Sequence, residues 1–190
     1  ATPLFISFDG EWGLAMRLKN TPTFPKNRIL GSIYDNNLIY EYGKEVARPC
    51  REIGVHINFA PVADVDNNPK NPIINTRSFG GDPENVSQKV IAYSRGLEDG
   101  GVLSVSKHFP GHGDTNVDSH KSLPVLNFDR ARLDSIELLP FKRVVEAGAG
   151  GVMVGHLLLP SICNSVASLS KPIIDILKSD LGFNGLVFSD

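Results

Sequence analysis

Cysteine, long apolar stretches and any excess of one charge are all scarce in this sequence of 190 residues. Its two cysteines, Cys50 and Cys163, are too few for a disulfide framework, and we expect two buried thiols rather than one bridge. No apolar run approaches the roughly 20 residues of a membrane-spanning helix. The formal net charge is -2, without blocks of like charge, so the chain offers no basic face. We therefore expect no nucleic-acid partner and no membrane span in this segment.

Two short catalytic motifs are also missing. No G-x-G-x-x-G follows the first apolar run, which argues against a dinucleotide-binding domain. No G-x-S-x-G is present, and Cys163 falls in an expected loop without an evident partner. These absences disfavour an enzyme that uses a serine or cysteine nucleophile.

What is present is an alternation of apolar runs and amphipathic segments. The apolar runs cover residues 3–8, 55–62, 102–106, 151–154 and 185–188. The segments with helical periodicity cover residues 34–53, 83–97, 129–147 and 171–181. Asp82 is the expected N-cap of the second helix, and Pro140 marks a break or new start in the third. Because the runs are continuous rather than alternating, they predict parallel strands buried on both faces.

Each apolar run ends in a polar or charged group. These groups are Asp9, Asp64, Lys107 with His108, His156 and Asp190. In a (β/α)8 barrel the active site is built at the carboxyl ends of the strands, although an open doubly wound sheet also binds ligands there. We predict an α/β fold, a TIM-type barrel of which residues 1–190 supply about five β-α units. We expect a single catalytic domain that is truncated at both ends.

The stretch from Lys107 to His120 is the densest in titratable groups. It contains three histidines, two aspartates and a lysine among prolines and glycines, a composition typical of a catalytic loop. Asp118 can orient His120 for acid–base catalysis, or cap a helix beside a solvated histidine. A metal site built on the three histidines with Asp114 and Asp118 is an alternative, but the spacing fits no metal motif. We interpret His112 as structural.

Asp190 and a group of cations are the other candidates. After an apolar strand, Asp190 can act as a nucleophile, as a metal ligand or as the N-cap of a following helix. Arg17, Arg77 and Lys107, with Asp9, suit a polyhydroxylated ligand, although each cation also suits a structural ion pair. Trp12 can stack on a sugar or anchor its loop.

Four sequence segments resemble one known family. The run K-H-F-P-G-H-G from Lys107, followed after four residues by Asp118-Ser119-His120, resembles a signature of family 3 glycoside hydrolases, in the β-N-acetylhexosaminidase branch. The segments at residues 58–65, 77–80 and 182–190 are similar to other parts of that family. The resemblance therefore covers the whole length of the chain.

The resemblance implies a barrel fold, no metal or cofactor, and a carbohydrate substrate. It implies an exo-acting, retaining β-N-acetylglucosaminidase that cleaves peptidoglycan fragments or chitooligosaccharides through a covalent glycosyl-enzyme. In this reading the catalytic residues are Asp190 as nucleophile, His120 as acid/base and Asp118 as its partner. The residues that bind the sugar are Asp9, Arg17, Arg77, Lys107 and His108.

The resemblance also leaves alternatives and one departure. A β-glucosidase or β-xylosidase of the same family is disfavoured because those enzymes lack the Asp-Ser-His loop, and a non-catalytic sugar-binding barrel is a further alternative. Many members have Gln-Glu-Gly-Gly where this chain has residues 10–13, so we expect Trp12 to add bulk near the pocket. The family allows for an appended domain in the full-length protein, and it favours the bacterial periplasm or cell envelope over the cytoplasm.

Overall fold

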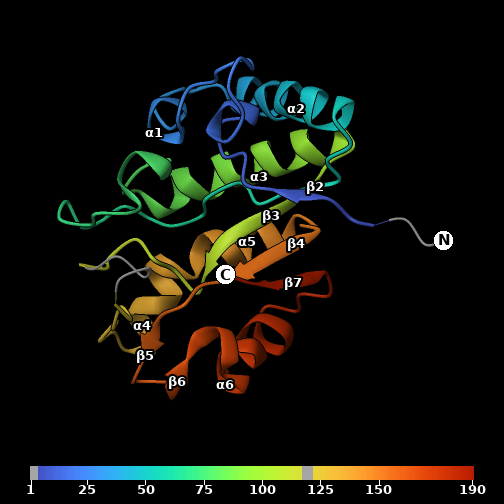
Figure 1. Ribbon diagram of the computed structural model, residues 1–190. Coiled ribbons are helices and arrows are strands. Elements are labelled where there is room, and N and C mark those ends of the chain that lie inside the picture. The colour runs from blue at the N-terminus through green and yellow to red at the C-terminus, as the bar shows by residue number, and fades with distance from the viewer. Residues whose placement is uncertain (1–3, 117–121) are drawn as a thin grey trace.

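The structure is a computed structural model that describes residues 4–116 and 122–190 as alternating strands and helices (Figure 1). Its strands are β1 (Ser7–Phe8), β2 (Ile57–Asn58), β3 (Leu103–Phe109), β4 (Gly151–Val154), β5 (Leu158–Leu159), β6 (Cys163–Val166) and β7 (Leu186–Ser189). Its α-helices are α1 (Asn27–Leu30), α2 (Asn36–Glu52), α3 (Pro83–Asp99), α4 (Arg130–Arg132), α5 (Leu139–Glu146) and α6 (Lys171–Asp175). Short 3-10 turns cover Leu14–Met16, Asn75–Arg77 and Ala167–Leu169, and π-helical turns cover Leu133–Glu137 and Ile176–Asp180.

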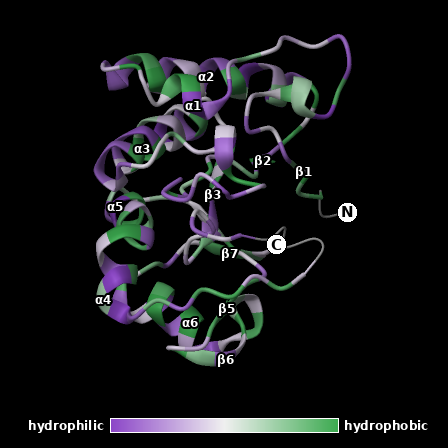
Figure 2. Ribbon diagram, turned by 90° about the vertical axis from the view of Figure 1, so that its left-hand side faces the viewer, coloured by the Kyte–Doolittle hydropathy of each residue, from purple (hydrophilic) through white to green (hydrophobic). Residues whose placement is uncertain are grey.

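Five parallel strands form the central sheet, in the order β1-β2-β3-β4-β7. The sheet is strongly curled. Phe59 follows β2 and Phe188 lies in β7, and their ring centroids are 5.4 Å apart although β3 and β4 separate these two strands in the sheet. Figure 2 shows α2, α3, α5 and α6 in an arc around one side of this sheet. The arrangement is an incomplete (β/α) barrel, as the sequence predicts.

The contact between α2 and α3 is a close approach of two backbones. Gly43 and Gly96 face each other there, and a Cβ atom on Gly96 would lie only 2.1 Å from the carbonyl oxygen of Tyr40. The side chain of Asp35 caps α2, and that of Asp82 caps α3 by accepting hydrogen bonds from two backbone N–H groups. The prediction of Asp82 as an N-cap is confirmed. Buried side chains of both helices, among them Val46 and Val90, join the main core.

Several local expectations change. The run at residues 3–8 gives only the short strand β1, with Leu4 and Phe5 exposed. The segment at 129–147 divides into α4, a π turn and α5. The predicted new start at Pro140 is confirmed, because Pro140 lies in the first turn of α5, where the missing N–H costs little.

The hairpin of β5 and β6 was not expected from the sequence, because its strands are short and only partly apolar. Cys163, expected in a loop, lies in β6. Both cysteines are free, but only Cys50 is buried, so the expectation of two buried thiols is wrong for Cys163. Among the described residues, no helix is long and apolar enough to cross a membrane.

Candidate active site

A cavity of about 350 Å³ opens at the carboxyl ends of the strands of the central sheet. Three strands contribute to it directly: Asp9 follows β1, Lys107 and His108 belong to the end of β3, and Asp190 follows β7. The backbone N–H of Asp190 donates to the carbonyl of Val154, which extends the pairing of β7 with β4. The lining residues are Asp9, Glu11, Met16, Arg17, Ile73, Arg77, Lys107, His108, His112 and Asp190.

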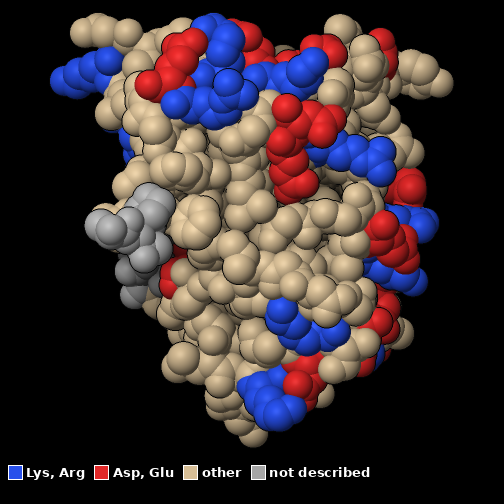
Figure 3. All heavy atoms as spheres, turned by 90° about the vertical axis from the view of Figure 1, so that its right-hand side faces the viewer, with Lys and Arg blue, Asp and Glu red and all other residues tan. Residues whose placement is uncertain are grey.

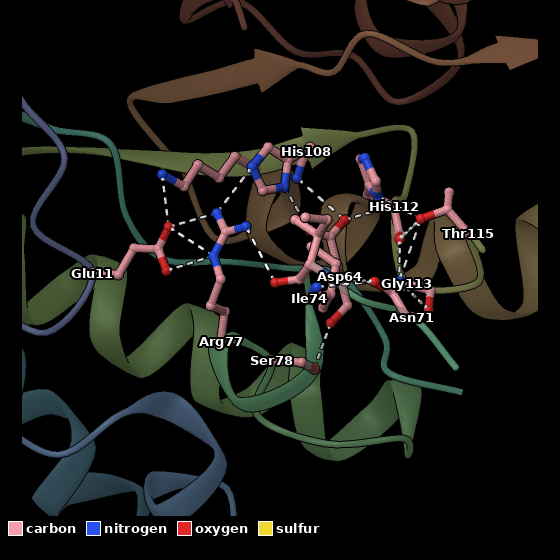
Figure 4. A network of polar contacts seen from close by, with 12 residues as sticks. Glu11, Asp64, Asn71, Ile74, Arg77, Ser78, His108, His112, Gly113 and Thr115 are labelled. Atoms are coloured by element: carbon pink, nitrogen blue, oxygen red, sulfur yellow. Dashed lines mark hydrogen bonds and ion pairs between the residues drawn. The ribbon is translucent and has the colours of Figure 1, made fainter. Parts of the chain in front are cut away.

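Glu11 is the centre of an ion cluster on the cavity wall. Its carboxylate accepts hydrogen bonds from Arg77 Nη2 at 2.7 Å and Nε at 3.0 Å, and Lys107 Nζ lies 3.0 Å from Oε1 (Figure 4). Burial alone raises the pKa of Glu11, but the charges of Lys107 and Arg77 outweigh it and hold this pKa at about 2. Glu11 is therefore a carboxylate at neutral pH, although only 1% of its surface is exposed.

Asp9 extends this cluster toward solvent. Its two carboxylate oxygens accept hydrogen bonds from Lys107 Nζ and Arg17 Nη2, both at 2.9 Å. Burial raises the pKa of Asp9, but the two cations outweigh it and the net shift is downward. The cavity wall is thus a chain of alternating charges rather than a patch of one sign.

His108 is held by a buried carboxylate behind the cavity. Asp64 Oδ2 lies 2.7 Å from His108 Nδ1, and Asp64 Oδ1 accepts the backbone N–H of His112 at 2.7 Å. On the other side of the ring, Arg77 Nη2 lies 3.4 Å from His108 Nε2 (Figure 4). Because an arginine can only donate, Nε2 accepts, and the proton of the neutral ring is on Nδ1, where it donates to Asp64.

The electrostatics agree with a neutral His108. Burial and the nearby charges of Arg77 and Lys107 lower the pKa of His108 well below its usual value. Burial also raises the pKa of Asp64 to about 6, because its side chain is fully enclosed. Asp64 thus orients His108 without making it an imidazolium.

His112 joins the Gly-Pro loop after β3 to the loop before α3. Its Nδ1 lies 2.8 Å from Thr115 Oγ1, and Asn71 Nδ2 donates to its backbone carbonyl at 2.8 Å. Gly113 lets the two loops approach closely, because a Cβ atom at this position would lie 1.8 Å from the carbonyl oxygen of Val65. Within the described ranges, His112 Nε2 is buried and has no hydrogen-bond partner. The interpretation of His112 as structural agrees with these contacts, although His112 also lines the cavity.

The cavity brings together most of the residues selected from the sequence, although contact with the cavity does not test their roles. The selected residues found in its lining are Asp9, Arg17, Arg77, Lys107, His108 and Asp190. Asp118 and His120 lie outside the described residues. Sequence reasoning missed the role of Glu11 in the cavity wall, although its place two residues after Asp9 is the available signal.

Three other strand-end or loop residues need correction or reassignment. His156 is exposed and does not line the cavity, so the expected regularity of strand ends fails after β4, where the chain turns into the β5–β6 hairpin. Trp12 is also absent from the cavity lining, and its ring lies beneath Lys26 at 4.9 Å from Nζ to the centroid. Asp64 lies behind the cavity, bonded to His108.

The described residues do not form the metal site considered as an alternative. Among residues 4–116 and 122–190, no group of three or more histidine, cysteine, aspartate or glutamate side chains is arranged to hold a metal ion. His108 Nδ1 contacts Asp64 Oδ2, and Asp64 Oδ1 accepts backbone N–H groups, which is an arrangement for fixing a ring orientation. Asp118 and His120, which also belong to this alternative, lie outside the described residues.

Comparison with known proteins identifies close relatives. Residues 1–190 match the family described as Glycosyl hydrolase family 3 N terminal domain. Beta-hexosaminidase A of Pseudoalteromonas piscicida is 36% identical over an alignment of 214 positions, which covers 99% of this chain and 35% of that protein. Beta-hexosaminidase LpqI of Mycobacterium tuberculosis is 39% identical over 199 residues, which cover 99% of this chain and 50% of that protein. The chain thus spans half or less of the length of these two relatives.

One solved structure has nearly the same fold. A glycoside hydrolase family 3 beta-N-acetylglucosaminidase from Paenibacillus sp. str. FPU-7 superposes with a TM-score of 0.95 at 41% identity, over 100% of this chain and 37% of that one. The match of the whole chain to one family, together with this superposition, carries the assignment. The chain belongs to glycosyl hydrolase family 3, to its N-terminal domain.

Proposed function

We propose that the full-length protein is a retaining, exo-acting β-N-acetylglucosaminidase. It removes terminal β-linked N-acetylglucosamine from peptidoglycan fragments or chitooligosaccharides. The main support is the position of Asp190 at the end of β7, on the wall of a cavity that also carries Asp9 and three cations. Relatives described as beta-hexosaminidases and a beta-N-acetylglucosaminidase support the same activity.

The cavity chemistry suits an uncharged sugar. Lys107 has three N–H groups, of which two are directed at Asp9 and Glu11, so within the part of the chain that the structure describes the third is left for a ligand hydroxyl. Asp9 can accept a hydrogen bond from a sugar hydroxyl, and Arg17 lies at the more exposed rim of the cavity. A cavity of about 350 Å³ is at the small end of ligand pockets. This size suits one terminal sugar and so agrees with the exo action that the family resemblance implies.

The proposed reaction has two displacements. First, a carboxylate oxygen of Asp190 bonds to the anomeric carbon while the bond to the leaving oxygen breaks, and His120 protonates that oxygen. Asp118 orients His120 and stabilises its charged form; the roles of both rest on the sequence motif. His120 then takes a proton from water, whose oxygen bonds to the anomeric carbon as the ester to Asp190 breaks. Two inversions retain the β configuration.

Hydrolysis of 4-nitrophenyl β-N-acetylglucosaminide by the full-length protein tests the proposal. We expect clear turnover, weaker turnover of the matching β-glucoside, and a loss of several orders of magnitude in kcat for Asp190→Asn. In Asp190→Gly, azide should restore glycosyl transfer and yield the α-glycosyl azide, because one displacement then replaces two. Near-normal turnover by Asp190→Asn would exclude it as nucleophile. Sugar binding without turnover by the wild type would indicate a sugar-binding barrel instead.

A further inference from the structure

The charges around the cavity cancel. Among its described lining residues there are three cations, Arg17, Arg77 and Lys107, and three carboxylates, Asp9, Glu11 and Asp190, so their formal charges sum to zero. The two lining histidines do not alter this sum when they are neutral, and burial together with Arg77 and Lys107 keeps the pKa of His108 low.

Glu11 differs from Asp9 in its access to solvent. The side chain of Glu11 is 1% exposed and that of Asp9 is 35% exposed. Glu11 contacts two of the three cations, through two hydrogen bonds from Arg77 at 2.7 and 3.0 Å and an ion pair with Lys107 at 3.0 Å. Water cannot screen such buried charges as it screens the exposed ones. The charge balance of the cavity wall therefore depends most strongly on Glu11.

The same contacts decide what the two cations can offer a ligand. With Glu11 ionised, Arg77 directs Nε and Nη2 at Glu11, and within the described residues Asp9 and Glu11 engage two of the three N–H groups of Lys107. Both then act as oriented hydrogen-bond donors with their charge already compensated. An uncharged polyol gains from such donors, whereas an anion needs uncompensated positive charge to offset its lost hydration.

We propose that Glu11 is a specificity-determining residue that makes the cavity select uncharged sugars and exclude anionic ligands. Glu11 does this by neutralising Arg77 and Lys107 through its hydrogen bonds and ion pair with them, without itself bonding to the sugar. The inference rests on the proposed function for the identity of the neutral ligand. Its prediction about anions concerns binding alone and does not require turnover.

The test compares binding of inorganic phosphate and of N-acetylglucosamine to the full-length protein by calorimetry, at pH 7 and constant ionic strength. Glu11→Gln keeps the size of the side chain and removes one negative charge, so the formal charge of the cavity lining rises from zero to +1. We expect it to bind phosphate at least about tenfold more tightly than the wild type, because a charge a few ångströms away is weakly screened there. We expect its affinity for N-acetylglucosamine to fall, because Arg77 and Lys107 lose their alignment.

Two controls separate charge from packing. Glu11→Asp keeps the charge but shortens the side chain, so it should exclude phosphate as the wild type does while binding the sugar less well. Glu98→Gln removes a carboxylate that is not part of the cavity lining. Glu98 also accepts hydrogen bonds, from Ser104 Oγ at 2.6 Å and from the Gly150 N–H at 3.1 Å. Both binding constants should stay at wild-type values in Glu98→Gln.

The inference is overturned if folded Glu11→Gln binds phosphate within about twofold of the wild type. If Glu11→Gln fails to fold, the double variant Glu11→Gln/Lys107→Met removes one charge of each sign and must bind phosphate as weakly as the wild type. Tighter phosphate binding by that double variant would equally overturn the inference. A wild type that binds N-acetylglucosamine but does not hydrolyse 4-nitrophenyl β-N-acetylglucosaminide would refute the proposed function and leave this test intact.

Discussion

Two sets of ion pairs in this domain use the same charged groups but differ in access to water. On α2, Arg48 pairs with Glu45 and Glu52 through side chains that are about half exposed. In the cavity wall, Glu11 pairs with Arg77 and Lys107, and its own side chain is 1% exposed. Figure 3 shows charged side chains of both signs gathered at the top of one face, at the height of α2 in Figure 1.

The difference lies in what each set can do. Exposed pairs contribute little to stability, because water and salt compete for both partners. Buried pairs carry a large desolvation cost, so they are weak evidence of stability but strong evidence of a required geometry. The cluster around Glu11 holds Arg77 and Lys107 in fixed orientations at the cavity, whereas the pairs on α2 are worth at most a small stabilisation of that helix.

The largest change in stability is expected from Arg77→Ala. This variant removes the hydrogen bonds that Nε and Nη2 donate to the buried carboxylate of Glu11, which then keeps only Lys107 among its described partners. We expect a destabilisation of about 3 kcal/mol, the lower end of the range for breaking a buried pair, because Lys107 still compensates part of the charge. Urea denaturation of the full-length protein measures it. A change no larger than that of an exposed arginine would remove the contrast between the two sets.

Asp64→Asn should affect activity more than stability. The asparagine can donate to His108 Nδ1, which places the ring proton on Nε2 and sets it against Arg77 Nη2, itself only a donor. We expect kcat/KM to fall by about ten- to hundredfold, as when a group that orients a metal-bound histidine is lost. Unchanged kcat/KM would show that the tautomer of His108 does not matter.

The two buried carboxylates should also respond to pH in opposite directions. The pKa of Glu11 is depressed from 4.5 to about 2, so its stabilisation is present above pH 4.5 and is lost as the pH falls toward 2. The pKa of Asp64 is raised from 3.8 to about 6, so its favourable contribution is present below pH 3.8 and is lost as the pH rises through 6.

Unfolding free energies measured between pH 2 and pH 7 would resolve these two windows. Glu11→Gln should remove the loss on the acid side, and Asp64→Asn should remove the loss between pH 4 and pH 6. Glu45→Gln on α2 is the exposed control and should leave both windows in place. If neither buried substitution alters its own window, the assigned ionisation states are wrong.

The smallest effect is expected from Arg48→Ala on the exposed face of α2. We expect little or no change in unfolding free energy and no change in kcat or KM. In 1 M salt even this difference should shrink, whereas that of Arg77→Ala should persist. A large destabilisation by Arg48→Ala would show that exposure does not separate the two sets.

Much of the fold was predictable because its signals are local. Continuous apolar runs mark the parallel strands, and the aspartate at residue 82 marks the start of α3. The β5–β6 hairpin was not predictable in this way, because its strands are short and half-polar. His156 shows the same limit: a polar residue after a strand need not lie in the cavity when the chain turns away at once.

The candidate site divides along the same line. The sequence by itself determined which polar residues follow the strands, because strand ends and the family resemblance are both readable along the chain. Only the tertiary structure decided that Glu11 pairs with Arg77 and Lys107 and that Asp64 holds His108. Ion pairing across dozens of residues depends on how the sheet curls and on which side chains lose contact with water. Neither property is written in the local sequence.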